Sequence, residues 1–207
     1  MATTESKRWV VEVGTPLVGA IDLATALARV PPRSLTKGMF YGRIADKTRD
    51  RWAELEKQLE APPKNGRYLP FTDYPTGDHV RLVLSAAERA FPDVGSREAL
   101  RRLGAFAFED FRASNVGRVM MQLLEEPLGA LERFPDAFTM TVKGVPRPKV
   151  KQLAEMHVMV EFGDSLAMPE YVAGLFEAII LHYRARPRIE VDLSLDEAPR
   201  YDVHWSP

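Results

Sequence analysis

Hydrophobic residues follow two different periods along this chain, and the change of period near residue 135 limits the folds that it can adopt. Before that point they recur every three or four residues, which is typical of amphipathic helices. After it, apolar and polar residues alternate, which predicts strands with one buried face. The first half is therefore predicted to be mainly helical, and the second half is predicted to form a sheet.

Two well-defined helices are predicted in the middle of the helical half. The first, over 79–91, carries its apolar residues on one face. The second begins at Ser96 and is apolar over much of its circumference, so we expect it to be buried between other elements. Asp78 and Ser96 are expected to cap these helices, because their side-chain oxygens can accept hydrogen bonds from first-turn N–H groups. Further helices are predicted over 21–30, 49–60, 114–126 and 127–134.

The second half is predicted to contain a sheet and one buried helix. The helix, over 169–183, opens with proline at its first position and carries an apolar stripe. In the segment 155–163, Met156, Val158, Val160 and Phe162 are expected to share the buried face of a strand. The predicted strands span 8–13, 138–144, 155–163, 188–195 and 201–205.

The order of these elements predicts the fold class. It is α+β, in which a mainly helical N-terminal half packs on a C-terminal antiparallel β-β-α-β-β unit. We expect an N-terminal strand and helix over 1–33, followed by a single domain over 34–207. Within that domain, the predicted helical lobe spans 34–135 and the predicted sheet lobe spans 136–207.

Composition argues against several classes of function. The net charge of −1 does not favour a nucleic-acid partner or attraction to an anionic membrane. Cysteine is absent, which excludes disulfides, thiolate nucleophiles and cysteine-bound zinc within this sequence. No apolar run approaches the roughly 20 residues of a membrane helix, and the N-terminal segment lacks the apolar core of a signal peptide. We therefore expect a cytoplasmic protein without membrane insertion.

Four motifs in a fixed order resemble a paralogous family of myxobacterial proteins of unknown function. They are KGMF at 37–40, YP at 74–75, FPDVGSREALRRLGAFAFEDFRASNVGR at 91–118 and EYVAGLFEAII at 170–180. The resemblance covers roughly residues 35–205, and it implies no particular activity.

The layout is also similar to the haem–nitric-oxide-binding (H-NOX) fold and to small-ligand domains of the 4-vinyl-reductase type. For haem, the H-NOX resemblance implies a proximal histidine just after the helix that starts with PLG, but Phe138 stands at about that place. It also implies a Tyr-x-Ser-x-Arg clamp before the last long helix, and GDSLAMPEYVAG at 163–174 has no such pattern. Without the axial nitrogen and the arginine, haem would lose its iron bond and its charge anchor. We expect no haem and no other cofactor.

The histidines and other reactive residues do not form a recognisable catalytic motif. His79 is expected at the surface of a helix, and His182 is expected in the last turn of a helix, where the dipole favours it. His157 and His204 are expected on the solvated face of the sheet, where they could alternatively bind a metal with Glu161 or Asp202. The sequence contains neither a G-x-S-x-G elbow nor a P-loop. We therefore predict that the protein is not an enzyme.

Two features suggest a binding site. Phe106, Met121 and Phe138, together with Phe108 and Met120, are expected where the helices meet the sheet, either in a ligand pocket or in an ordinary packed core.

The second feature is a pair of basic segments on either side of the buried helix. If they converge, Arg147, Lys149, Arg184 and Arg186 could form a cationic rim for an anionic group; otherwise, they are solvated loop residues.

These observations favour a non-enzymatic regulatory or sensory module. It would bind a small apolar or anionic ligand, or a protein partner. The alternative is a structural protein that forms a homodimer through its helical face. A third possibility, an enzyme of an unrecognised type, would show a cleft with convergent polar side chains and a displaced histidine or carboxyl pKa.

Overall fold

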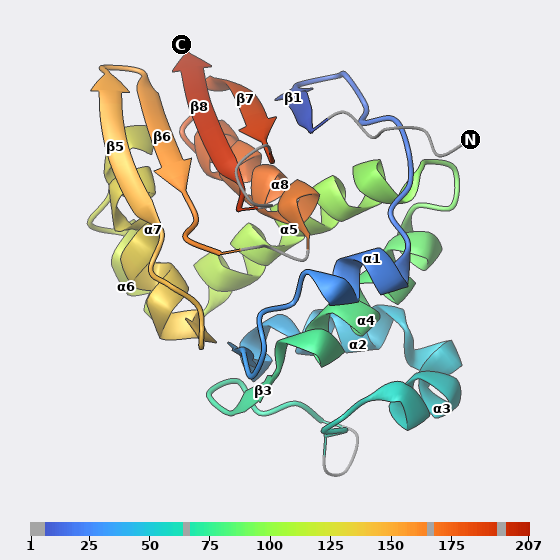
Figure 1. Cartoon of the computed structure of the whole chain (residues 1–207). Coiled ribbons are helices and arrows are strands. Elements are labelled where there is room, and N and C mark those ends of the chain that lie inside the picture. The colour runs from blue at the N-terminus through green and yellow to red at the C-terminus, as the bar shows by residue number, and fades with distance from the viewer. Residues whose placement is uncertain (1–6, 64–66, 165–167, 194–197) are drawn as a thin grey trace.

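The computed structural model describes residues 7–63, 67–164, 168–193 and 198–207 of the chain. It consists of a five-stranded antiparallel sheet with helices on one side and a second, mainly helical lobe below (Figure 1). The predicted α+β class is confirmed, with helices mostly in the first two-thirds of the chain and the sheet at the C-terminal end. No helix in the described part of the chain is long and apolar enough to span a membrane.

The large sheet joins the two ends of the chain. Its strand order is β1-β7-β8-β6-β5, and every neighbouring pair is antiparallel. The N-terminal strand β1 is an edge strand beside β7, so residues from the predicted N-terminal unit lie in this sheet. The strands are β1 (Arg8–Glu12), β5 (Lys149–Ala154), β6 (His157–Glu161), β7 (Arg186–Asp192) and β8 (Arg200–Ser206).

The alternating pattern buries one face of this sheet, as the sequence predicts. Val158 and Val160 are fully buried, as is Val203 on the neighbouring strand. Met156, predicted on the same face, instead lies in the turn before β6 and is exposed. The order strand-strand-helix-strand-strand is present, although its first strand is β5 and not the predicted segment 138–144. The end of the predicted strand 188–195 lies outside the described residues.

Helix α8 (Pro169–His182) covers the buried face of the sheet and is itself covered by α5 (Ser96–Ala113). The two helices approach closely because glycines face each other's backbone. A Cβ atom on Gly104 would collide with the Tyr171 carbonyl, and one on Gly174 would collide with the Arg101 carbonyl. The predicted sandwiching of the second helix is therefore correct.

The other lobe is built around α4 (Thr76–Ala90), which packs against α1, α2 and α5. A small three-stranded sheet, ordered β3-β2-β4, adjoins it. Its strands are β2 (Leu35–Lys37), β3 (Asp73–Pro75) and β4 (Val142–Lys143). The remaining helices are α1 (Leu23–Ala28), α2 (Gly42–Lys47), α3 (Trp52–Leu55), α6 (Asn115–Met121) and α7 (Pro127–Thr141), with 3₁₀ turns η1 (Gly38–Phe40), η2 (Arg49–Arg51) and η3 (Glu56–Gln58).

The predicted strand at 138–144 is wrong over 138–141, because α7 continues to Thr141. Its last part does form a strand, since Val142–Lys143 is β4 and pairs with β2 in the small sheet. Pro135 lies inside α7 without ending it. Phe134 and Phe138, one turn apart, both pack against the core aromatic Phe162. This burial outweighs the β-propensity of the Thr-rich segment, and the Thr141 hydroxyl donates back to the helix at the Ala137 carbonyl (2.9 Å). The predicted lobe boundary between residues 135 and 136 consequently falls within a helix.

Both predicted helix caps are also wrong, because these side chains hold distant loops. Asp78 lies inside α4, and its carboxylate accepts hydrogen bonds from the backbone N–H groups of Glu60 and Ala61, each at 2.9 Å. The Ser96 hydroxyl accepts from the N–H of Ile21 at 2.8 Å and donates to its carbonyl at 3.2 Å. The predicted helix over 49–60 is likewise broken into α3 and the flanking 3₁₀ turns.

Candidate ligand cavity

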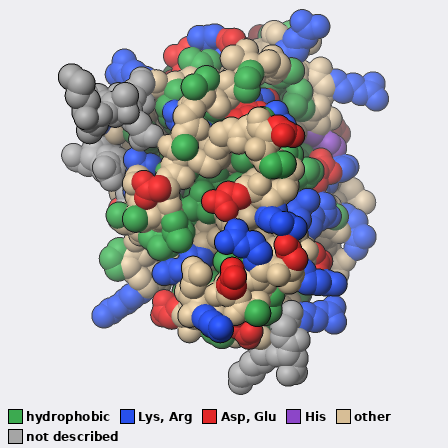
Figure 2. Space-filling model, turned by 90° about the vertical axis from the view of Figure 1, so that its right-hand side faces the viewer, with side chains coloured by type: hydrophobic (Ala, Val, Ile, Leu, Met, Phe, Trp, Pro, Cys, Tyr) green, Lys and Arg blue, Asp and Glu red, His purple; other side chains and the backbone are tan. Residues whose placement is uncertain are grey.

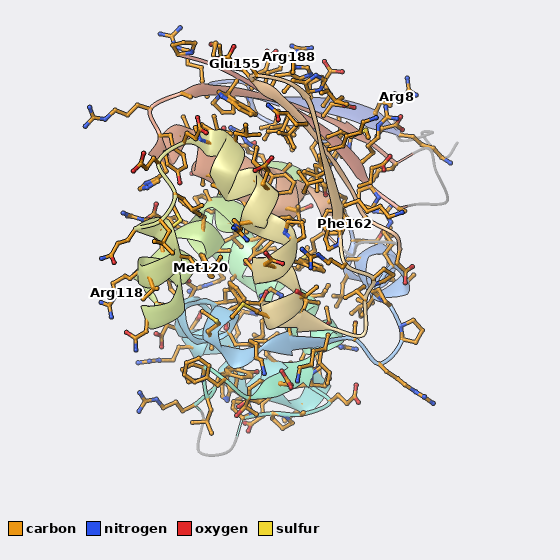
Figure 3. All side chains as sticks on the ribbon, turned by 90° about the vertical axis from the view of Figure 1, so that its left-hand side faces the viewer. Arg8, Arg118, Met120, Glu155, Phe162 and Arg188 are labelled. Atoms are coloured by element: carbon orange, nitrogen blue, oxygen red, sulfur yellow. The ribbon has the colours of Figure 1, made fainter. Side chains whose placement is uncertain are left out.

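A cavity of about 170 Å³ lies where the two lobes meet. Its lining comes from α4, α5, α6, α7 and α8 and from the β2 and β4 region. In Figure 3, α6 and α7 occupy the layer between the sheet at the top and the small helices at the bottom, and the lining residue Met120 is labelled on α6. The cavity thus lies at the predicted junction of helices and sheet.

Most of the lining is apolar. Met121 and Phe138, which the sequence analysis places at this junction, both line the cavity, as do Phe108 and Met120. Phe106 points elsewhere: it is 37% exposed, stacks on Phe91 with ring centroids 6.2 Å apart, and lines a surface depression. Because α5 is apolar over most of its circumference, its sequence does not indicate which of its aromatic residues face the cavity.

One end of the cavity is polar. It is formed by Ser34 and Thr36 at β2, and by Thr76 and His79 on the first turns of α4. The N–H of Thr76 donates to the Ser34 carbonyl at 3.0 Å, and the hydroxyls of Thr36 and Thr76 lie 3.0 Å apart. These bonds fix the β2 region against the start of α4, and His79 lies one helical turn beyond Thr76.

His79 is buried at this polar end, so its predicted surface position is wrong. The ring is 6% exposed and lies beside the rings of Tyr41 and Tyr171, at centroid distances of 5.0 and 5.9 Å. Its Nε2 has no hydrogen-bond partner among the described residues. Burial lowers its pKa to about 4, although a backbone hydrogen bond with Phe40 opposes this shift. The imidazole is therefore neutral at physiological pH.

A second buried polar atom at the same end is the Ser34 hydroxyl. The residue is 4% exposed, and its Oγ likewise has no partner in the part of the chain that the structure describes. Neither residue is predicted from the sequence as part of a site. For His79 a signal exists: it lies four residues before Val83 and so extends the apolar stripe of α4. For Ser34 we find no such signal.

The two basic segments do not converge. In the strand register, Lys149 lies opposite Glu161 at one end of the large sheet, whereas Arg186 lies opposite Ser206 at the other end. Arg184 follows α8 with a φ of 61° and belongs to the connection into β7. Arg147 is bound to an acidic residue, Asp136 on α7, at 2.6 Å. In Figure 2, basic and acidic side chains lie interspersed on the visible face.

The predicted strand-face histidines do meet. His157 and His204 are direct partners in the register, and their rings stack with centroids 3.7 Å apart. His157 Nε2 lies 3.3 Å from Asp202 Oδ1. Burial and the neighbouring His157 lower the pKa of His204. Within the described ranges, no group of three or more histidine or acidic side chains could hold a metal ion. His182 lies in the last turn of α8, as predicted.

Residues 29–206 match the sequence profile of the family described as protein of unknown function DUF2378. The chain belongs to the DUF2378 family. No curated protein matches it. The family resemblance predicted from the ordered motifs is thus confirmed, while its restriction to myxobacteria stays a prediction.

Solved H-NOX structures resemble this DUF2378 chain in fold. The unliganded Fe(II) H-NOX protein from K. algicida superposes with a TM-score of 0.60 at 15% identity, covering 83% of this chain and 97% of that one. The Fe(II)NO H-NOX protein from S. oneidensis gives 0.63 at 13% identity, covering 83% and 99%. An oxygen-binding H-NOX domain related to soluble guanylate cyclases gives 0.60 at 18% identity, covering 83% and 95%. The predicted H-NOX-like architecture is confirmed as a fold.

The cavity of this DUF2378 chain does not fit a haem in the way that this fold implies. On α7, the helix that begins with PLG, the aromatic residues facing the cavity are Phe134 and Phe138. Among the described lining residues the one imidazole is His79, which comes from α4. The lining arginine, Arg133, is 67% exposed and lies 3.6 Å from Asp136, so it is not an internal charge anchor. The volume of about 170 Å³ is close to that of cavities that hold benzene, and a porphyrin is several times larger.

Proposed function

We propose that this chain is a sensory module that binds a small, mostly apolar molecule in the cavity between its lobes. One observation carries the proposal: about 170 Å³ of space remains where the helical lobe meets α7 and α8. Protein interiors are normally packed as densely as organic crystals, so a hollow of this size lined mostly by apolar side chains is unusual between two packed lobes. An engineered apolar cavity of roughly 150 Å³ in another protein binds benzene, which sets the expected ligand size.

The position of the cavity suits sensing. A ligand there would contact α4 in one lobe and both α7 and α8 next to the large sheet. A ligand shifts a conformational equilibrium only when it binds the two states differently. A ligand that contacts both lobes would lose or gain contacts if the lobes packed differently, so its affinity would differ between the two arrangements. The H-NOX-like fold, which in the related structures belongs to oxygen- and nitric-oxide-bound proteins, supports the same role.

Binding without catalysis fits His79 better than an enzymatic role does. Polar side chains converge in the cavity and the histidine pKa is displaced, as an enzyme would require. However, a general base works best with a pKa near the working pH, and a pKa of about 4 makes His79 a weak base. We therefore propose that its nitrogen recognises a ligand and does not move a proton.

The test uses toluene as the probe and a variant that fills the cavity. Ala107 on α5 lines the cavity and is 4% exposed, so Ala107→Leu would occupy part of the space. Ala113, at the exposed end of the same helix, lies outside the lining, and Ala113→Leu is the matched control.

Calorimetric titration should show toluene binding to the wild type and to Ala113→Leu, with a raised Tm. Binding should be lost in Ala107→Leu, provided that circular dichroism shows the variant to be folded. If toluene does not bind the wild type, or if it binds Ala107→Leu equally well, the proposed function is wrong.

The predicted alternative, a homodimer through the helical face, has one supporting observation. Val119 on α6 is 62% exposed, and Leu123, just beyond that helix, is 78% exposed. Sedimentation velocity of the wild type and of Val119→Ser/Leu123→Ser measures this directly. A dimer that dissociates in the double variant and ignores toluene would favour the structural role.

A further inference from the structure

The environment of His79 gives the cavity a chemical preference for its ligand. Within the ranges that the structure describes, no protein group bonds to Nε2, although this residue is 94% buried (6% exposed) and lines the cavity. The rings of Tyr41 and Tyr171 hold the imidazole in place. A buried polar atom without a partner lowers stability, so a native protein that keeps one usually has a use for it.

The tautomer of His79 determines which group this nitrogen can bind. The imidazole has a backbone hydrogen bond with Phe40 that favours its protonated form, so Phe40 contributes its carbonyl oxygen, which only accepts. Since this bond does not involve Nε2, the proton lies on Nδ1, and Nε2 carries a lone pair in the neutral ring. The nitrogen therefore requires a hydrogen-bond donor from the ligand.

The second polar atom at this end, Ser34 Oγ, can donate or accept. The Ser34 carbonyl accepts a hydrogen bond from the N–H of Thr76, and His79 follows Thr76 by one helical turn, so the two residues that carry these unpaired atoms line the same end of the cavity. A hydroxyl group both donates and accepts, which matches this pair.

We propose that the cavity selects an apolar molecule that carries one hydroxyl group, which donates to Nε2 of His79 and accepts from Oγ of Ser34. This inference rests on the proposed function, because it presupposes that the cavity binds a ligand. His79 is then the residue that determines specificity, and the aromatic and aliphatic lining accommodates the rest of the molecule. Ligands of this chemistry include phenols and short alcohols.

The experiment compares phenol with toluene, which has nearly the same shape but no donor. In a purely apolar cavity phenol should bind about tenfold more weakly than toluene, because its hydroxyl loses water without a replacement partner. In the wild type we expect phenol to bind at least as tightly as toluene. In His79→Leu, toluene binding should persist while phenol becomes about tenfold weaker than toluene.

A pair of serine variants provides the matched control. Ser34→Ala should weaken phenol binding a few-fold and leave toluene unchanged. Ser85, on α4, is also buried with an Oγ that lacks a partner among the described residues, but it does not line the cavity. Ser85→Ala should therefore leave both affinities unchanged. Because neither serine change adds volume, these variants test the proposal even if His79→Leu fails to fold.

Anisole, the methyl ether of phenol, keeps the oxygen and loses the donor. It should bind no more tightly than toluene. If neither toluene nor phenol binds the wild type, the proposed function fails. If toluene binds but phenol is about tenfold weaker in the wild type, or if anisole binds as tightly as phenol, the role of His79 as an acceptor is overturned while the cavity remains a binding site.

Discussion

Arg101 and Glu177 form a two-point ion pair between α5 and α8, in which Nε and Nη2 of the arginine each lie 2.8 Å from a carboxylate oxygen. The arginine also donates to Glu98 at 2.9 Å and to the Thr15 carbonyl at 3.0 Å. Glu98 in turn accepts from the backbone N–H of Leu17 at 3.0 Å. This buried network holds the N-terminal segment, α5 and α8 together beneath the sheet.

Replacing Arg101 should therefore destabilise the fold strongly. Arg101→Met leaves the buried Glu177 without its counter-charge, and we expect a loss of about 3–5 kcal/mol in the free energy of unfolding. In the double variant Arg101→Met/Glu177→Leu much of this loss should be recovered, because no buried charge is left unpaired at residue 177. Urea unfolding monitored by circular dichroism measures both.

The control for this pair lies on the same helix. Arg112 and Glu109 also form an ion pair, but both side chains are 44% exposed. Arg112→Met should change stability by less than about 1 kcal/mol. If Arg101→Met and Arg112→Met lost equal free energy of unfolding, the buried network would contribute no more to stability than the surface ion pair does.

The close approach of α5 and α8 gives a second prediction. Gly174→Ala places a Cβ against the Arg101 carbonyl, which cannot move without shifting α5, so we expect a loss of about 3 kcal/mol or more. Gly129 in α7 has only an ordinary contact, 3.6 Å from Leu124 Cδ2, for an added Cβ. Gly129→Ala should leave stability unchanged or raise it by up to about 1 kcal/mol. Thermal unfolding of the two variants distinguishes steric conflict from helix propensity, since propensity alone would stabilise both.

Four of the five strands of the large sheet were predictable from sequence because their signal is local. The fifth, β5, was missed, since this edge strand is mostly exposed and has no alternation of buried and exposed residues. Alternation places Val158 and Val160 on one face whatever the partner strands are, and both are buried. The segment 138–144 misled the prediction because its β-branched residues carry a strand propensity that tertiary packing overrides. Phe134 and Phe138 meet Phe162 only once the sheet is present, and no local pattern contains that contact.

The candidate site was predictable only in part, for a similar reason. Met121 and Phe138 belong to apolar stripes that point towards the junction, so the sequence could place them there. The polar end depends on pairing between residues 40 positions apart, Thr36 and Thr76, which brings Ser34 beside α4. His79 was predicted at the surface because its imidazole is polar, although its position four residues before Val83 puts it on the buried apolar stripe of α4.

Burial of His79 makes stability depend on pH. Its pKa is about 4 in the folded protein and 6.5 in the unfolded reference, so between these values the unfolded chain binds a proton that the folded protein does not. Stability is therefore lost as the pH falls from about 7 towards 4, by roughly 3 kcal/mol for this residue. His204, whose pKa is also lowered, contributes in the same direction.

The measurement is urea unfolding at a series of pH values for the wild type and for His79→Leu. Other titrating groups are common to both proteins, so the difference between the two curves isolates His79. The wild type should lose more stability on acidification than the variant. Parallel curves would mean that His79 is not buried in its neutral form.

Asp78 distinguishes a local helix cap from a long-range anchor. Its side chain is fully buried, and its carboxylate holds the N–H groups of Glu60 and Ala61 at the end of the α3 region. A surface cap would contribute about 1 kcal/mol. Asp78→Ala instead leaves two backbone donors without their charged acceptor, so we expect a loss of about 2–3 kcal/mol. Asp78→Asn should cost less, because one acceptor oxygen remains.

Hydrogen exchange locates the effect of the Asp78 change. In Asp78→Ala the amides of residues 60 and 61 should exchange much faster than in the wild type, while those in the middle of α4 keep their protection. Asp22→Ala is the control, because Asp22 is an exposed cap of α1 that accepts from the Thr25 N–H at 2.8 Å. That variant should lose about 1 kcal/mol and leave residues 60 and 61 protected. Faster exchange confined to the first turn of α4 in Asp78→Ala would mean that the residue acts as the local cap and does not anchor the loop.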